Sequence, residues 1–237
     1  MPETTLKVSL IAHTPDPEKT CSLAARTCYS ALDMDALKKT VEEKDQAEFL
    51  RRILSSGHLS VLEHASFTFS IEGVSRALMA QLTRHRIASF SVQSQRYVSL
   101  ANGFSYVIPP RIRDMGEEAV KQFEGQMAAM HAWYKEWQKR LGENANEDAR
   151  FVLPNACETH ITMTMNAREL LHFFSLRCCN RAQWEIRALA REMLRLCKQA
   201  APVIFEKAGP GCVSGPCPEG GKSCGQTLHM REYFSKL

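Results

Sequence analysis

A run of alternating polar and apolar residues places a β-strand in the first third of the chain. Within Ser66–Ile71, the side chains of Phe67, Phe69 and Ile71 occupy every second position. Side chains spaced by two residues lie on one face of a pleated strand, so these three are expected to face a hydrophobic core. This is the clearest strand in the sequence, and it requires a sheet with at least one buried face.

Helical patterns account for most of the remaining chain. Apolar residues recur there at intervals of three and four, and capping residues or glycines mark several of the ends. Because the helices are not regularly interleaved with strands, the pattern favours an α+β fold, with helices packed around a mixed or antiparallel sheet. The expected helices begin near Thr14–Glu18 and span Lys44–Ser56, Val74–Leu82, Glu117–Leu141, a short turn from Asn146 toward Pro154, a segment capped by Asn166, and Trp184–Ala200.

Four of these helices carry more specific expectations. If the helix from Val74 continues far enough, Gln81, Arg84 and His85 lie on one side of it, at positions i, i+3 and i+4. Asn146 is expected to cap the short helix that presents Arg150. Gly57 is expected to end the helix Lys44–Ser56. The helix 117–141 is expected to bury an apolar stripe formed by Met127, Met130, Trp133, Trp137 and Leu141.

Length and composition indicate a globular protein with one main domain. The chain has 237 residues, of which 44% are apolar, and no stretch approaches the roughly 20 apolar residues that cross a bilayer. The amino terminus lacks the pattern of a secretory signal, so a cytoplasmic location without membrane attachment is expected. The composition changes only near the end, which predicts a domain over 1–205 and a Cys/Gly-rich tail over 206–237.

Polar and charged residues concentrate between Arg84 and Tyr97 in the segment RHRIASFSVQSQRY. Arginine keeps its charge at any relevant pH and presents a planar fork that matches phosphate oxygens, while serine and glutamine add directed hydrogen bonds. Such a set suits the phosphate and base of a nucleotide. A solvated charged turn is the alternative, but Ile87, Ala88 and Phe90 interleave the charges and require part of the segment to pack.

The order Arg84-His85-Arg86, seven residues and then Ser94 resembles the signature of the flavin-dependent thymidylate synthases. Further stretches that are similar to this family follow in the same order, between Ala24 and about Ala200. They are Gly57-His58, Glu63-His64, Gln81, Arg150 before Pro154, Asn166-Ala167-Arg168, Leu176-Arg177 and Ala182-Gln183-Trp184-Glu185.

The resemblance implies a homotetramer of α+β subunits in which several chains build each active site. It implies FAD as cofactor and a methyltransferase reaction that converts dUMP to dTMP. Methylenetetrahydrofolate would donate the one-carbon unit, reduced FAD the hydride, and NADPH would reduce the flavin again. The cofactor would carry the difficult chemistry, while the protein supplies orientation and charge.

The resemblance also assigns residues to each ligand. Arg177 is expected to be catalytic, because a fixed cation near N3 of the uracil ring favours its ionisation in a water-poor site. The FAD set is His58, Ser60, Arg84, His85, Arg86, Val92 through its backbone, Asn166, Ala167, Arg168 and His172, the last at a position where an asparagine can occur. The dUMP set is Gln81, Arg84, Gln93, Ser94, Gln95, Arg96, Arg150 and Arg177.

Helix geometry constrains this assignment. Arg168 and His172 are four residues apart and share a helix face, whereas Arg177 lies about 140° around the axis from His172. One regular helix therefore does not easily direct all three side chains into one pocket. Either the helix is interrupted before Arg177, or its two faces serve different sites in an oligomer.

Metal binding is the less favoured interpretation of the histidines and cysteines. His58 and His64 lack a third ligand at a convincing spacing, and His131 and His160 are expected to be structural. In the tail, Cys212, Cys217 and Cys224 could hold zinc or an iron-sulfur cluster with a distant fourth ligand, although a closed surface flap or an incidental disulfide is favoured. No metal is expected. The other cysteines that neighbour apolar helical residues are expected to be inert core thiols: Cys28, Cys157, Cys178, Cys179 and Cys197.

Two other function classes remain open on the sequence alone. One is a protein that holds RNA or single-stranded DNA phosphates with the patch from Arg84 to Arg96. The low net charge of +4 and the few aromatic residues in the patch argue against it. The other is an enzyme of a different nucleotide reaction that kept the fold and lost the flavin.

Overall fold

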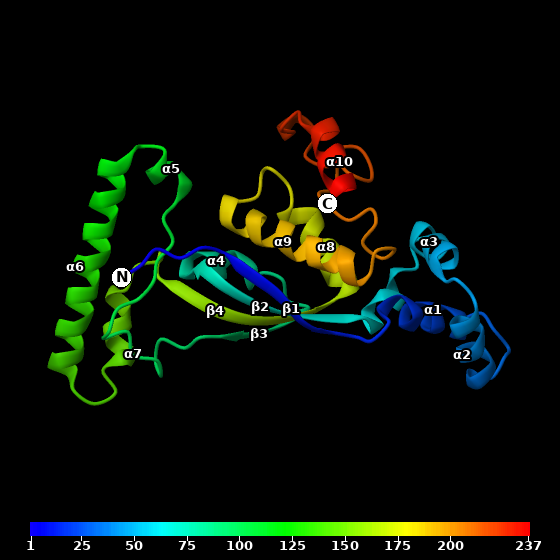
Figure 1. The fold of residues 1–237 in the computed structure, drawn as a ribbon, viewed down its shortest axis with the longest axis horizontal. Helices are drawn as coiled ribbons and strands as arrows, with labels where there is room; N and C mark the ends of the chain where they lie inside the picture. Colours follow the sequence, from blue (N-terminus) through cyan, green and yellow to red (C-terminus); the bar gives the residue numbers. More distant parts are fainter. The chain divides into compact units, whose positions relative to one another are not determined.

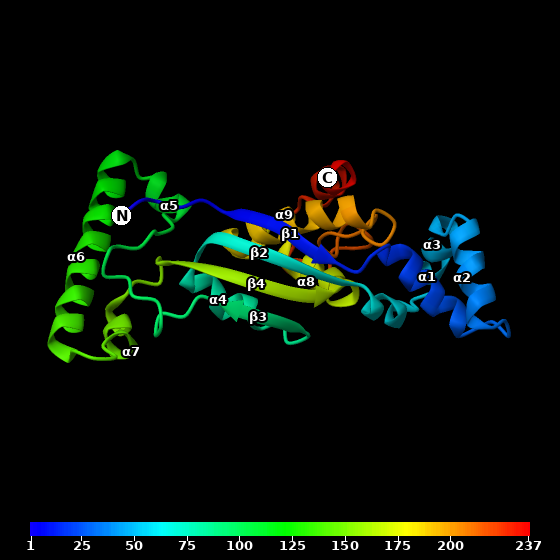
Figure 2. The same ribbon diagram turned by 60° about the horizontal axis from the view of Figure 1, so that its bottom comes forward.

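The computed structural model describes residues 1–237 and has an α+β fold with one four-stranded antiparallel sheet. The sheet contains β1 (Lys7–His13), β2 (Ser66–Ser75), β3 (Ala88–Val92) and β4 (Glu158–Asn166). Their order across the sheet is β1-β2-β4-β3 (Figure 2). The expected fold class is confirmed, and the antiparallel option is the one observed.

The strand predicted from alternation is confirmed and is longer than expected. Phe67, Phe69 and Ile71 are all fully buried, while the strand continues to Ser75. β4 also alternates, because Thr159, Ile161, Met163 and Met165 are buried. The edge strands β1 and β3 show little burial and therefore carry weaker sequence patterns.

The chain forms two compact units. Unit 1 comprises 1–7, 71–84 and 90–162, and unit 2 comprises 8–70, 85–89 and 163–237. The boundary falls inside all four strands, so each strand contributes to both units.

Unit 1 contains several helices and a small apolar cluster of its own. They are α4 (Arg76–Leu82), α5 (Pro110–Arg113), α6 (Glu117–Leu141), α7 (Asn146–Ala149) and a 3₁₀ turn at Arg150–Val152 (Figure 1). Phe104, Tyr106 and Ile108 pack with Met127 of α6 in the cluster. The predicted bounds of α6 are confirmed.

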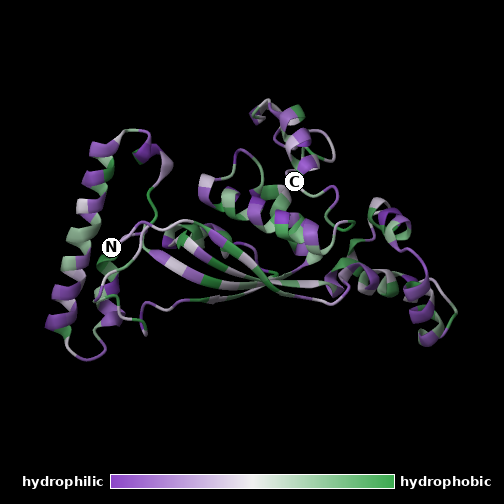
Figure 3. Ribbon diagram, viewed as in Figure 1, coloured by the Kyte–Doolittle hydropathy of each residue, from purple (hydrophilic) through white to green (hydrophobic).

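Two expectations for the unit 1 helices are wrong. Along α6, Met127 and Tyr134 are buried, whereas Trp133 and Trp137 are 53% and 44% exposed in the single chain. Apolar and hydrophilic residues therefore mix along α6 (Figure 3). Asn146 is not the cap of α7, because its Oδ1 instead accepts hydrogen bonds from the Tyr134 hydroxyl at 3.1 Å and from Gln138 at 2.6 Å.

Unit 2 contains the remaining helices. They are α1 (Pro17–Thr27), α2 (Met34–Glu43), α3 (Ala47–Ser55), a 3₁₀ helix at Leu59–His64, α8 (Ala167–Arg177), α9 (Trp184–Ala200), a 3₁₀ turn at Gly220–Lys222 and α10 (Thr227–Lys236). The expected helix from Lys44 begins three residues later, and α2 was not anticipated. The bounds of α9 are as predicted. No helix is both long and apolar enough to cross a membrane.

Aromatic side chains hold the core of unit 2 together. The ring of Phe205 makes edge contacts with Phe67 of β2 and Phe174 of α8, at centroid distances of 5.4 and 5.9 Å. The C-terminal helix α10 also packs, because Met230 and Phe234 are buried and the guanidinium of Arg191 lies 5.0 Å from the Tyr233 ring. The last residues of the chain are thus part of the packed unit.

Candidate functional site

The turn from β4 into α8 is fixed by a side-chain cap. Asn166 ends the strand in an extended conformation, and its Oδ1 accepts a hydrogen bond of 2.9 Å from the backbone N–H of Glu169. This satisfies one of the free N–H groups at the helix start and confirms the predicted cap. The first turns of α8 are therefore held in a defined orientation, with Arg168 and His172 on the same side.

A cavity of about 630 Å³ lies beside this face of α8. Its lining combines three apolar side chains with five polar or charged ones. The guanidinium of Arg168 forms an ion pair with Glu63, and both side chains are about half exposed. The lining residues are Leu59, Glu63, Ile87, Asn166, Arg168, Glu169, Leu171 and His172.

His58 and Ser60 line a smaller cavity of about 190 Å³ in the same unit. The Tyr29 hydroxyl lies 2.9 Å from Nδ1 of His58, and the two rings are nearly parallel. Tyr29 is 70% exposed and follows α1 directly, so no periodicity in the sequence distinguishes it. Among the expected FAD residues, His58 and Ser60 therefore form one group, and Asn166, Arg168 and His172 form another.

The predicted gathering of Gln81, Arg84 and His85 on one helix is wrong. Helix α4 ends at Leu82, and the Thr83 hydroxyl closes it by donating to the Met79 carbonyl at 2.8 Å. Arg84 folds back and donates from Nε to the Ala80 carbonyl at 3.3 Å. His85 lies beyond the helix and belongs to unit 2.

His85 joins two residues of α8 in a buried chain of hydrogen bonds. Its Nδ1 lies 3.1 Å from Oε1 of Glu169, and the Nε of Arg177 lies 3.0 Å from its Nε2. His85 and Glu169 are only 4% and 8% exposed. Glu169 was not among the expected site residues, although its spacing from Asn166 is that of a capping box and could have drawn attention to it.

The two ends of α8 serve different surroundings. The helix is uninterrupted from Ala167 to Arg177, so an interruption before Arg177 is excluded. Arg168 and His172 line the large cavity together, as their spacing predicted, while Arg177 contacts His85 instead. Burial lowers the pKa of Arg177, yet arginine remains charged at any ordinary pH.

The expected dUMP residues other than Arg177 belong to unit 1. Glu147 brings two of them together, because its carboxylate accepts from Nη2 of Arg96 at 3.0 Å and its backbone carbonyl accepts from Nε of Arg150 at 2.9 Å. Both arginines are held near one acidic residue, which leaves a net positive charge. Glu147 lies far from Arg96 in sequence, and nothing in the motif pointed to it.

The segment after β3 is held mainly through its backbone. The Gln93 N–H donates to the His160 carbonyl at 2.9 Å, and the Ser94 carbonyl accepts from the Val98 N–H at 3.0 Å. Gln95 lies 3.8 Å from the thiol of Cys157. Gln81 lies at the end of α4. Arg86 is exposed and lines neither of the two cavities described above.

Residues 9–203 match a family model described as "Thymidylate synthase complementing protein". The chain belongs to this family. Proteins named flavin-dependent thymidylate synthase are similar to it over nearly their whole length. The protein of Geobacter sulfurreducens is 55% identical over 98% of this chain and 99% of its own, and that of Clostridium tetani is 47% identical over 97% of both. A relative from Pyrococcus furiosus is 45% identical over 90% of both chains.

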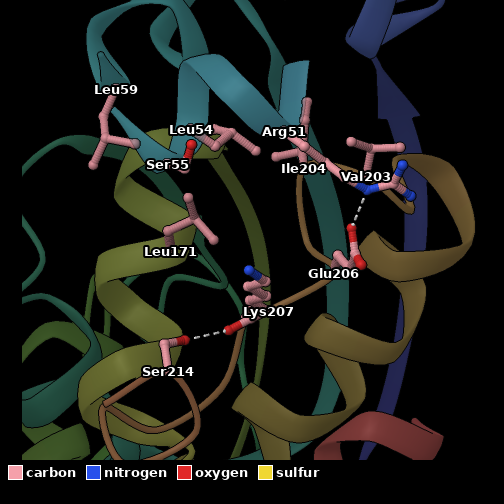
Figure 4. Close-up of a pocket in the computed structure, with 11 residues that line it drawn as sticks. Arg51, Leu54, Ser55, Leu59, Leu171, Val203, Ile204, Glu206, Lys207 and Ser214 are labelled. Atoms are coloured by element: carbon pink, nitrogen blue, oxygen red, sulfur yellow. Dashed lines mark hydrogen bonds and ion pairs between the residues drawn. The ribbon is translucent and has the colours of Figure 1, made fainter. Parts of the chain in front are cut away.

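A third cavity is lined by residues on both sides of position 203, at which the match to the thymidylate synthase complementing family ends. It has a volume of about 380 Å³ and is lined mainly by apolar side chains, including Leu54, Leu171 and Ile204 (Figure 4). An ion pair of 2.7 Å between Arg51 and Glu206 borders it. Leu59 and Leu171 also line the 630 Å³ cavity, so these two leucines separate the two spaces.

All nine cysteines are reduced thiols, and no group of three or more His, Cys, Asp or Glu side chains is arranged to hold a metal ion. Cys157, Cys178 and Cys197 are buried, as expected for core thiols. Cys28 is exposed and Cys179 is partly exposed, so the expectation of burial is wrong for these two. His131 is structural, since its Nε2 lies 3.0 Å from the Leu100 carbonyl.

Proposed function

We propose that this chain catalyses the reductive methylation of dUMP to dTMP, with FAD as redox cofactor and methylenetetrahydrofolate as the one-carbon donor. The observation that carries this conclusion is the family match over 9–203, together with the polar and apolar cavity beside α8 in that region. Every relative compared is named flavin-dependent thymidylate synthase, so the nucleic-acid-binding alternative has no support.

The lining of the 630 Å³ cavity suits FAD. Leu59, Ile87 and Leu171 offer apolar surface to a flavin ring, while Arg168 offers a guanidinium that matches a diphosphate. Glu63 holds that guanidinium in the free chain, so a bound phosphate would replace a carboxylate as its partner. Bound FAD would supply the hydride that completes the methyl group.

The proposed FAD residues divide between binding and positioning. Arg168 and His172 reach the cavity directly, and Asn166 holds the backbone from which both project. His58 and Ser60 line the neighbouring small cavity, where Tyr29 orients the histidine. Arg84, Arg86, Val92 and Ala167 remain in the proposed set through the resemblance alone.

The proposed dUMP set centres on Arg96 and Arg150. Two guanidinium groups near one carboxylate retain a net positive charge, which attracts a nucleotide phosphate. Gln93, Ser94 and Gln95 lie in the turn that precedes Arg96, and their side chains would provide hydrogen bonds to the sugar and base. Gln81 and Arg84, at the end of α4, complete the set.

Arg177 is the proposed catalytic residue. A guanidinium near N3 stabilises the anion that forms when the uracil ring loses its proton, and this makes the carbon that receives the methyl group more nucleophilic. Partial burial of Arg177 strengthens such an interaction, because fewer water molecules compete with the anion.

We further propose that the active enzyme is a homotetramer with shared sites and that NADPH reduces its flavin. Several large apolar side chains that directly follow an arginine of the proposed site are exposed in the single chain, namely Ile87, Tyr97 and Phe151. Exposed apolar groups of this size are typical of surfaces that another subunit covers. The segment 206–237 lies outside the family match, and we propose that it is an accessory tail to the catalytic region 1–205.

The visible spectrum of the purified protein tests this function. We expect a flavin absorbance that bleaches with NADPH under anaerobic conditions and recovers only when dUMP and methylenetetrahydrofolate are added together. Formation of dTMP should accompany the recovery. Colourless protein that cannot be reconstituted with FAD would rule the proposal out, and salt-sensitive RNA binding by such protein would favour the nucleic-acid alternative.

A further inference from the structure

Glu169 is a carboxylate that is only 8% exposed and lies among buried apolar residues of α8. It lies in the first turn of α8, next to the fully buried Leu170 and one turn before the fully buried Phe173. A buried carboxylate loses favourable hydration, and an apolar residue of similar size would fill the same space without that loss. Its carboxylate lies 3.1 Å from Nδ1 of His85, so its role is tied to that histidine.

The hydrogen-bond directions around His85 follow from its partners. The Nε–H of Arg177 is always a donor, so Nε2 of His85 must be the acceptor and carry no proton. The remaining ring proton is then on Nδ1, where it donates to the Glu169 carboxylate. His85 is therefore neutral, in one defined tautomer, and both of its ring nitrogens are engaged.

The surroundings of His85 favour that neutral form. Burial lowers its pKa, and the charge of Arg177 and the neighbouring His172 lower it further, whereas the Glu169 carboxylate opposes this shift. These three are the titratable groups that face His85, and all belong to α8. The ring of Phe173 also contacts His85 edge-on, with a centroid distance of 4.9 Å.

We infer that Glu169 and His85 are positioning residues that hold the guanidinium of Arg177 in its working orientation. Glu169 fixes the tautomer of His85, and His85 accepts a hydrogen bond from the Nε of Arg177. A guanidinium has five N–H donors, and this bond fixes the direction of one of them. The inference rests on the catalytic role proposed above for Arg177. It also changes the expectation for His85. Both ring nitrogens are bonded within the protein, so His85 would support the flavin site indirectly and not through a ring nitrogen.

Two substitutions of Glu169 separate positioning from packing. Glu169→Gln keeps the shape and an oxygen that accepts from Nδ1 but removes the charge, and we expect kcat for dTMP formation to fall about tenfold. Glu169→Leu removes the acceptor, and we expect a loss of roughly 100-fold, since a displaced catalytic group costs about that much. In both variants the KM for dUMP, the flavin absorbance and the flavin reduction by NADPH should change far less than kcat.

The dependence of dTMP formation on pH separates a positioning role from a packing role, because a change in packing alone would not shift it. Protonation of Nε2 removes the acceptor for Arg177, so dTMP formation should decline as the pH falls through the pKa of His85. Because the carboxylate of Glu169 favours the protonated histidine, Glu169→Gln should shift this acid limb to lower pH. Glu185→Gln, at the other buried first-turn glutamate, is the matched control and should leave the limb in place.

A double-mutant cycle completes the test. If Glu169 acts through Arg177, Glu169→Leu should have almost no further effect on kcat in an Arg177→Ala background. Additive losses, or a wild-type acid limb in Glu169→Gln, would overturn the positioning role. A different result, unchanged turnover in Arg177→Ala alone, would refute the proposed function of Arg177 itself. If Glu169→Leu fails to retain FAD, the pH profile of the isosteric glutamine variant decides the question.

Discussion

Among the glycines, Gly73 of β2 has the tightest surroundings. Its φ of +70° lies in the left-handed region, and a Cβ built on it would fall 1.8 Å from the Thr5 carbonyl oxygen. Its backbone N–H donates to Oε1 of Glu158, which also accepts from the Thr4 hydroxyl. The N-terminal segment thus lies against β2 at a position where only glycine fits.

Gly73→Ala should therefore destabilise the protein by at least about 3 kcal/mol, from backbone strain and the clash with Thr5. Gly125→Ala is the matched control, because Gly125 lies on the exposed side of α6 with no atom within 4 Å of its added Cβ. That substitution should stabilise the protein by about 0.5 to 1 kcal/mol. Chemical denaturation of both variants measures the difference, and equal midpoints would contradict the account of Gly73.

The thiols should differ sharply in their reactivity. Burial raises the pKa of Cys157 to about 11 and that of Cys197 well above its usual range, so neither forms the reactive thiolate near neutral pH. Cys28 and Cys224 are exposed. Iodoacetamide at pH 8 should label Cys28 and Cys224 first, as read by peptide mass spectrometry. Early labelling of Cys197 in the folded protein would show that its surroundings are more open than described.

At the level of elements, α8 matters most, because its start and its end hold different parts of the proposed site. Asn166 caps the start, Arg168 and His172 face the large cavity, and Arg177 at the end contacts His85. Asp33 provides a comparable cap for the peripheral helix α2, where its Oδ1 accepts from the Ala36 N–H at 2.8 Å. The two caps can therefore be compared directly.

Asn166→Ala and Asp33→Ala should each cost about 1 kcal/mol of stability, the usual effect of removing a helix cap. Only Asn166→Ala should also reduce FAD affinity, because its helix start presents Arg168 to the cavity. Titration of the apoprotein with FAD, followed by fluorescence, checks this. Equal FAD affinity in the two variants would separate the α8 cap from the flavin site.

The sequence predicted those elements whose pattern is local. α6 and α9 were predicted with both ends, since each has a long helical pattern between clear boundaries, and β2 was predicted because one of its faces is buried. β1, β3 and β4 were not predicted. β1 and β3 are exposed edge strands with little alternation, whereas β4 alternates and buries one face, so its local pattern was missed. The end of α4 depended on a single threonine hydroxyl, which no periodicity indicates.

The same distinction holds for the candidate site. The spacing of Arg168 and His172 predicted a shared face, and both line one cavity. Two of the acidic partners could not be found in this way, because Glu63 meets Arg168 and Glu147 meets Arg96 only through the tertiary fold, whereas the spacing of Glu169 from Asn166 is a local signal. Cations within motifs are visible in a sequence, whereas the carboxylates that orient them are mostly distant in it.

For the whole molecule, the exposed aromatic residues around the signature lead to a prediction about assembly. Phe151 is 81% exposed and adjacent to Arg150, whereas Leu228 is equally exposed but lies in the tail beyond the family match. If the proposed tetramer covers the signature region, Phe151→Glu should weaken it and Leu228→Glu should not. Light scattering should give about four times 26.7 kDa for the parent and Leu228→Glu.

A smaller mass and lower dTMP formation are expected for Phe151→Glu. A parent protein that is monomeric and fully active would exclude shared sites altogether. If both variants remain tetrameric, the contact surface lies elsewhere on the chain and Phe151 has another role.

The interrupted course of the chain through its two compact units limits how a protein like this can change. The boundary between the units falls inside each of the four strands, so no contiguous stretch of the gene encodes either unit. A single recombination event therefore cannot exchange one unit for that of a relative without cutting a strand.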